Sequence, residues 1–178
     1  MKRNLVISFV FLAAMLILMR LQGNNLITPQ SPRGIIDFEL AQTERRFRQL
    51  LLFWDHETVL RNIYFNFLLI MAYAWFFVSA CKAVGNSGST IFSGLTLSAG
   101  AFDILENFLM VLVWNERLSP SLLRVIFYAA ILKFLLLVIV VGFLILSLFG
   151  LFKKESSTWL IFDRWNISDL RQDQKKVR

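Results

Sequence analysis

Four long apolar segments separated by charged stretches constrain the fold of this 178-residue chain more than any other feature. They occupy residues 4–20, 62–82, 91–114 and 122–152. Each has about the length that a helix needs to cross roughly 30 Å of hydrocarbon. Only 17% of the residues are charged, whereas soluble domains carry about 25%. The sequence therefore predicts an all-α integral membrane protein with four transmembrane helices.

The short connections between the later spans predict how the helices are arranged. "GNSG", residues 85–88, separates the second span from the third, and "NERLSP", residues 115–120, separates the third from the fourth. Such short connections make neighbouring helices antiparallel. We therefore expect one membrane domain, residues 1–178, that forms an up-down four-helix bundle.

Basic residues at the helix ends predict the orientation of the chain. Lys2 and Arg3 precede the first span, and Lys153 and Lys154 follow the fourth. Cytoplasmic segments next to a membrane are enriched in Lys and Arg. Both termini, including the tail of residues 153–178, are therefore expected in the cytoplasm. No small-x-small cleavage site precedes "LQGNN" after the first span, so we expect this span to be an uncleaved anchor.

The charge, cysteine and histidine contents exclude several kinds of partner and site. Membrane topology and contact with anionic lipid explain the net charge of +7, so lipids, and not nucleic acid, are the expected partners. A membrane-protein partner or a homo-oligomer also fits the composition. The single cysteine, Cys81, and the single histidine, His56, are too few for a disulfide, a zinc or iron–sulfur site, or bis-histidine haem.

No catalytic or nucleotide-binding motif is present, so neither a catalytic residue nor a cofactor is expected. "DHE", residues 55–57, has the residue types of a metal or acid–base site. Three adjacent residues of a helix point in different directions, however, and we expect this run to cap the second span instead.

Residues 34–56, between the first two spans, form the one substantial extramembrane segment before the tail. Apolar residues recur there at intervals of three and four, which predicts one apolar helical face with charged residues opposite. Thr43 is a candidate N-cap, so two short helices with a break near Gln42 are expected. The segment is expected to lie flat on the membrane, to cover the mouth of the bundle, or to be a solvated connector. The apolar face comprises Ile36, Leu40, Phe47, Leu50, Leu51 and Trp54.

The third span contains an unusual group of polar residues, Asp103, Glu106 and Asn107. Their spacing of i, i+3 and i+4 places all three on one face of a helix. Ala99 and Gly100 continue this face with small side chains, which allow a neighbouring helix to approach closely. The polar face is therefore predicted to point into the bundle.

Lys133 in the fourth span is the predicted partner of these acids. Glu106 lies eight residues before the end of the third span, and Lys133 lies eight residues after Val125, so the two are level at about 12 Å from the turn. Tyr73 in the second span has the depth of Asp103 and could donate to it, while Asn66 lies nearer the outer surface. The predicted intramembrane network comprises Asn66, Tyr73, Asp103, Glu106, Asn107 and Lys133.

Two acids face one base in this predicted network, so one carboxyl lacks an opposite charge and is expected to hold a proton. A carboxyl that gains and loses a proton inside a membrane is suited to proton-coupled transport. The same residues would also fix the helices in register, since interhelical hydrogen bonds contribute about 0.6 kcal/mol each. A structural lock and a functional site both remain open.

Several motifs resemble an uncharacterised family of small bacterial membrane proteins with four predicted helices. They are "GIIDFELAQT" (34–43), Trp54, "NFLLIMAY" (66–73) and "AGAFDILEN" (99–107), in this order. The resemblance implies a bacterial inner-membrane protein and no known activity. The family often has an aspartate at the position of Asn66, and its replacement here weakens any mechanism that needs a third carboxyl.

The sequence thus favours a non-enzymatic membrane protein that binds another membrane component, either a subunit or a lipid-like ligand. The alternative is a small proton- or ion-coupled carrier that uses Asp103, Glu106 and Lys133.

Overall fold

The computed structural model describes residues 2–85, 88–115 and 118–149. Apart from one isolated β-bridge between Thr28 and Ser31, these residues contain no β-structure, which confirms the all-α class. The elements are α1 (Lys2–Gly23), the 3-10 helix η1 (Asn24–Leu26), α2 (Ile36–Glu39), α3 (Glu44–Leu51), α4 (His56–Val84), α5 (Ser89–Trp114) and α6 (Pro120–Leu148).

Four of the described helices, α1, α4, α5 and α6, are long and apolar enough to cross a membrane. Large apolar side chains are exposed along all of them, as expected for surfaces that face lipid. Examples are Val10 on α1, Met71 on α4, Leu97 on α5 and Val138 on α6. The chain is therefore a multi-pass membrane protein. The tail of residues 153–178 lies outside the described residues.

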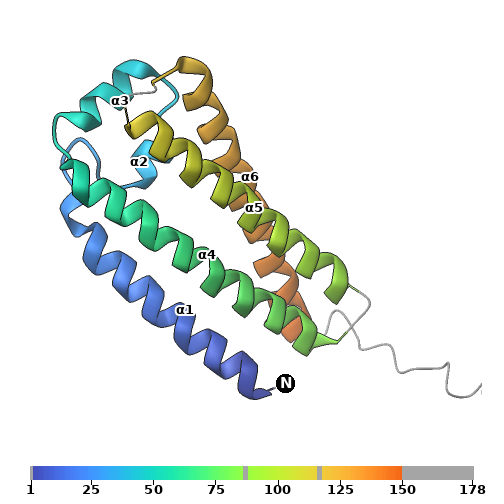
Figure 1. Cartoon of the computed structure of the whole chain (residues 1–178). Coiled ribbons are helices and arrows are strands. Elements are labelled where there is room, and N and C mark those ends of the chain that lie inside the picture. The colour runs from blue at the N-terminus through green and yellow to red at the C-terminus, as the bar shows by residue number, and fades with distance from the viewer. Residues whose placement is uncertain (1, 86–87, 116–117, 150–178) are drawn as a thin grey trace, which may run out of the picture.

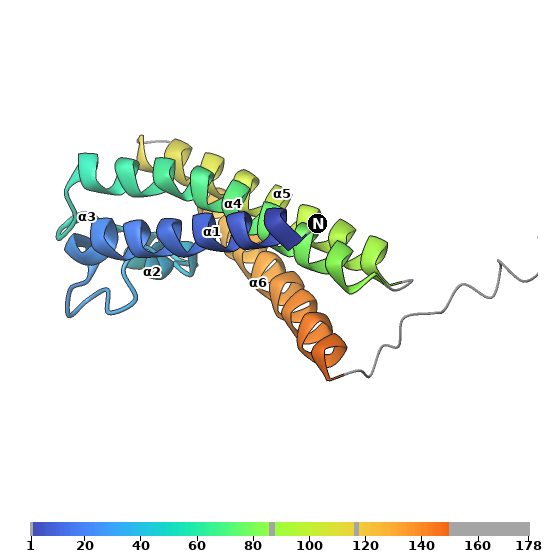
Figure 2. The same ribbon diagram turned by 90° about the horizontal axis from the view of Figure 1, so that it is seen from below.

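The four long helices run up and down, and they do not close into a symmetric bundle. In Figure 1, α1, α4 and α5 lie side by side, with α6 behind α5. α1 packs mainly along α4, while α5 packs along both α4 and α6. Figure 2 shows α6 diverging from the layer of the other three helices towards its C-terminal end.

Local signals in the sequence explain where the helices begin and end. The carboxylate of Asp55 accepts hydrogen bonds of 2.9 Å from both the backbone N–H and the hydroxyl of Thr58, so α4 is capped where the sequence predicts. These two bonds also lower the pKa of Asp55. Gly85, with φ 66°, ends α4 in the left-handed conformation. Thr43 caps α3 by accepting from the N–H of Arg46 at 3.3 Å, which confirms the predicted break between α2 and α3.

Residues 24–55, which we call the cap, cover the end of the bundle opposite the N-terminus (Figure 1). The ring centroids of Phe38, Phe47 and Trp54 lie 5.8, 6.0 and 6.3 Å from that of Trp114 at the end of α5. The indole N–H of Trp54 also donates to the carbonyl oxygen of Leu26 at 2.9 Å. Of the three positions expected for the amphipathic segment, the structure shows the one over the mouth of the bundle.

The apolar face of the cap differs in part from the predicted one. Phe47 and Trp54 are buried, and Ile36 and Leu40 are half-buried, but Leu51 is 40% exposed. The break before α3 changes the direction of the helix, and Trp54 follows after α3 has ended. A single helical stripe through the whole segment therefore does not exist, and Leu51 lies outside the buried part of the predicted face.

Candidate functional site

The structure brings together all six residues of the predicted network, and Asp103 lies at its centre. Its Oδ1 accepts from Lys133 Nζ at 3.1 Å, from Asn66 Nδ2 at 3.1 Å and from Asn107 Nδ2 at 3.0 Å. Its Oδ2 accepts from the hydroxyl of Tyr73 at 3.0 Å. A carboxylate has about four acceptor sites, so this side chain is fully hydrogen-bonded. It connects α4, α5 and α6.

Glu106 is completely buried and lies against the same lysine. Its Oε2 is 2.8 Å from Lys133 Nζ, which agrees with the predicted equal depth of the two residues. This contact is a buried ion pair. Both carboxyl oxygens of Glu106 are buried without a hydrogen-bond partner among the described residues. Glu106 is thus held less completely than Asp103.

A third acid, Glu39, reaches the network from the cap. Its Oε2 lies 3.2 Å from Lys133 Nζ, and its side chain is only 6% exposed. Burial away from water raises the pKa of this carboxyl above its ordinary value. Glu39 is absent from the network predicted from the sequence. The available signal was its position three residues after Ile36, on the apolar side of a short amphipathic helix.

Lys133 therefore faces three buried carboxyls. We call Glu39 and the six predicted residues together the polar network. The nitrogen of Lys133 lies within 3.2 Å of an oxygen from each of Glu39, Asp103 and Glu106. If all three acids were ionised, the cluster would carry two uncompensated negative charges in a buried place. Such charges are costly, and bound protons are the simplest way to remove them.

Small residues allow the helices to meet around this network. Ala99 and Gly100 on α5 are buried, and a β-carbon added to Gly100 would lie 3.6 Å from Ile70 on α4 and 3.8 Å from the hydroxyl of Tyr73. The face predicted to point into the bundle thus lies against α4.

The arrangement is suited to holding helices in register and to storing protons. No group of three or more His, Cys, Asp or Glu side chains in residues 2–85, 88–115 and 118–149 is placed to hold a metal ion. Glu39 and Lys133 join the cap to α6, and Asp103 joins α5 to both of its neighbours. The network is therefore where the cap and three of the spans are fixed to one another.

Comparison of the chain with protein-family models, with curated proteins and with solved structures finds no match.

Proposed function

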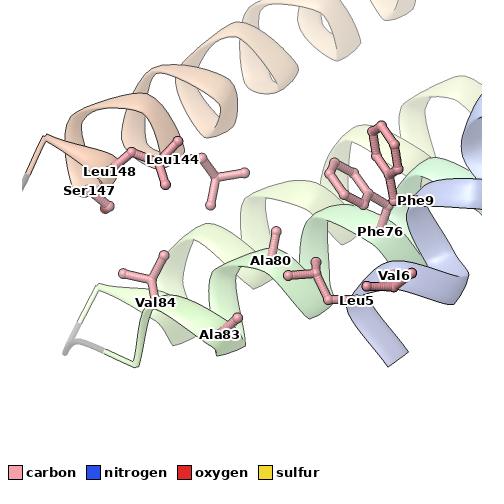
Figure 3. A pocket seen from close by; sticks show the side chains of 10 residues that line it. All are labelled: Leu5, Val6, Phe9, Phe76, Ala80, Ala83, Val84, Leu144, Ser147 and Leu148. Carbon is pink, nitrogen blue, oxygen red and sulfur yellow. The ribbon is translucent and has the colours of Figure 1, made fainter. Parts of the chain in front are cut away.

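We propose that this protein is a non-enzymatic protein of the bacterial inner membrane that binds another membrane component, either a subunit or a lipid-like ligand. The observation that carries the proposal is an apolar groove of about 660 Å³ between α1, α4 and α6 (Figure 3). Its size is within the range of ligand sites, roughly 300–1,000 Å³. The groove opens where α6 diverges, at the end of the bundle opposite the cap.

The polar network serves in this proposal as a lock that gives the groove a rigid frame. The contacts of Lys133 with Glu39, Asp103 and Glu106 join the cap, α5 and α6. Asn66 and Tyr73 attach α4 to the same carboxylate. With these elements fixed at one end, and with Val140 and Phe143 of α6 packed beside Cys81 of α4 near the other end, the groove keeps its shape without a ligand.

The proposed membrane and orientation rest on the sequence. The resemblance to small bacterial membrane proteins supports an inner membrane, and the basic residues at the groove end support a cytoplasmic position for both termini. The cap would then lie on the outer face.

Native mass spectrometry of the protein extracted from its own membrane in mild detergent tests the proposal. We expect a stoichiometric partner, a second copy of the chain with a bound component, or a retained lipid. A monomer that carries nothing, or a purified chain with an enzymatic activity, would refute the proposal.

A second function, a small proton-coupled carrier, is favoured by the three carboxyls that share Lys133. The double substitution Asp103→Asn with Glu106→Gln separates the two functions. Loss of proton flux in proteoliposomes, with the fold and assembly preserved, would support the carrier. Collapse of the fold, or proton flux that is absent from the wild type as well, would support a purely structural role of the polar network.

A further inference from the structure

We propose that the groove binds an acyl chain of an anionic glycerophospholipid, with the headgroup phosphate at the basic end of the bundle that carries Arg3 and Lys82. This inference rests on the proposed function and names the ligand. It follows from the shape of the groove, from one unpaired hydroxyl and from the distribution of charge along the bundle.

The shape of the groove suits a long, narrow apolar group. Leu5 and Phe9 of α1 form one wall and Leu144 of α6 forms another, while Ala80 and Ala83 of α4 lie between them (Figure 3). The two alanines leave space that larger side chains on the same helix would fill. No charged residue lines the groove. An acyl chain can occupy such a space, since it needs no hydrogen-bond partner along its length.

One polar atom lies in this apolar lining. The hydroxyl oxygen of Ser147, on the last turn of α6, is buried and has no hydrogen-bond partner among the described residues. A buried hydroxyl without a partner costs roughly 1–3 kcal/mol. A glycerophospholipid places an ester carbonyl, which is a good acceptor, between its acyl chain and its phosphate. Ser147 lies near the end of α6, at the level where such an ester would meet the groove.

The charges at this end of the bundle select an anionic headgroup. Lys82 lies between Ala80 and Ala83 in the sequence and is exposed, and the exposed Arg3 precedes Leu5 by two residues. Every Asp and Glu of the described residues lies elsewhere, in α2, in α3, at the start of α4 or in the polar network. The groove end is therefore basic without nearby acids from the described part of the chain. Each Lys or Arg near a membrane surface contributes about 1 kcal/mol of attraction to anionic lipid.

The tail of this chain is a weaker occupant. Its apolar residues alternate with charges such as Asp163 and Arg164, and insertion of the segment would carry these charges into hydrocarbon at a cost of roughly 2.5 kcal/mol each or more.

The test uses the full chain in detergent, titrated with phosphatidylglycerol or phosphatidylcholine of identical acyl chains and followed by native mass spectrometry. We expect one tightly held phosphatidylglycerol, preferred about tenfold or more over phosphatidylcholine. Lys82→Gln should lower this preference about fivefold, which corresponds to the loss of one charge of about 1 kcal/mol. Arg124→Gln removes the same charge from the exposed start of α6, at the cap end, and should leave the preference unchanged.

A second pair of variants tests the groove itself. Ala80→Phe should fill it and reduce binding of both lipids at least tenfold, whereas Ala101→Phe places the same ring on an exposed face of α5 and should have no effect. If Ala80→Phe fails to fold, the two charge variants still decide the headgroup assignment.

Equal binding of the two lipids, equal effects of Lys82→Gln and Arg124→Gln, or binding that appears only when residues 155–178 are removed would overturn the inference. The last result would show that the tail occupies the groove. A retained protein partner without lipid would overturn this inference and leave the proposed function standing, whereas a chain that retains nothing would refute both.

Discussion

Replacing Glu39 by Gln is predicted to cost little, although this residue forms one of the three buried ion pairs in the described structure. The change keeps the shape of the side chain and removes only its ability to ionise. Replacing Lys133 by Met removes the one base that all three acids share. We expect the two variants to differ by several kcal/mol in the free energy of unfolding.

The distances give the sign of the Glu39 prediction. At 3.2 Å from Lys133 Nζ, an ionised Glu39 gains an attraction of roughly 5 kcal/mol at an effective dielectric constant of about 20. Oxygens of Asp103 and Glu106 lie within 3.1 Å of the same nitrogen, so each is at most roughly 6 Å away and repels Glu39 by at least roughly 3 kcal/mol. If both of these acids were ionised, the two repulsions would about offset the attraction. Burial away from water then favours the neutral form of Glu39 and is the main cause of its raised pKa.

The raised pKa of Glu39 makes its contribution depend on pH. A carboxyl whose pKa is raised by folding contributes fully below its ordinary value of 4.5, and this contribution is lost as the pH rises through the folded value. Glu39→Gln cannot ionise, so it should cost at most about 1 kcal/mol near pH 5 and become relatively more stable at pH 8–9. Lys133→Met should cost about 3–5 kcal/mol, because it leaves buried carboxyls without a base.

Equilibrium unfolding in detergent micelles, followed by tryptophan fluorescence between pH 5 and 9, measures these differences. Glu44→Gln is the matched control, because Glu44 pairs with Arg48 on the surface of the cap and should contribute no more than about 0.5 kcal/mol. A loss for Glu39→Gln as large as that for Lys133→Met, or a difference from the wild type that does not change with pH, would refute the reasoning.

Three further predictions concern the cap and its junction with α4. Gly34 has φ 62°, a conformation that costs other residues about 1–2 kcal/mol, so Gly34→Ala should lower the thermal unfolding midpoint. Trp54→Phe removes an indole N–H that donates to the carbonyl of Leu26 and to the hydroxyl of Ser31; because Ser31 still donates to that carbonyl, the change should cost about 0.5–1.5 kcal/mol, seen as faster limited proteolysis of the cap. Asp55 has a lowered pKa because it accepts from Thr58, so its stabilisation is present above its ordinary pKa of 3.8 and is lost as the pH falls through the folded value. The unfolding midpoint of Asp55→Ala should therefore depend less on acid than that of the wild type.

The sequence was sufficient for the fold class because segment length and apolar content determine which helices can cross a membrane. It was less sufficient for the helix boundaries. α4 begins at His56 and not at residue 62. Its first turns are polar, and they are stabilised by the N-cap residue Asp55 and by tertiary contacts such as the hydrogen bond of 2.8 Å from Asn62 to Gln22. Hydropathy does not detect such turns, although the N-cap signal was visible.

The polar network could be predicted where it depends on regular geometry. The spacing within α5 and the equal lengths on both sides of the turn between α5 and α6 are sufficient to align Glu106 with Lys133. Glu39 could not be found in this way, because its position depends on how the cap folds against α6. The charge count also argued against a third acid in the network, because it increases the excess of negative charge around a single lysine.

The two ends of the bundle differ in a way that bears on function. At the cap end, aromatic side chains of the cap pack on Trp114 and Glu39 of the cap pairs with Lys133, so Trp114 Nε1 and the Glu106 oxygens, which are buried and lack a hydrogen-bond partner among the described residues, are covered by the cap. At the other end, α6 diverges, a hydroxyl at Ser147 lacks a partner within the described chain, and the charges of Arg3 and Lys82 have no acid beside them in the described sequence. An unsatisfied group that lines a groove, as Ser147 does, offers binding energy, because a ligand that pairs with it displaces no internal partner. Binding to the groove end would then require no opening of the cap. A carrier that used the polar network would instead have to break the contact between Glu39 and Lys133 in each cycle. Cross-linking the cap to α6 should therefore abolish transport and leave lipid binding intact.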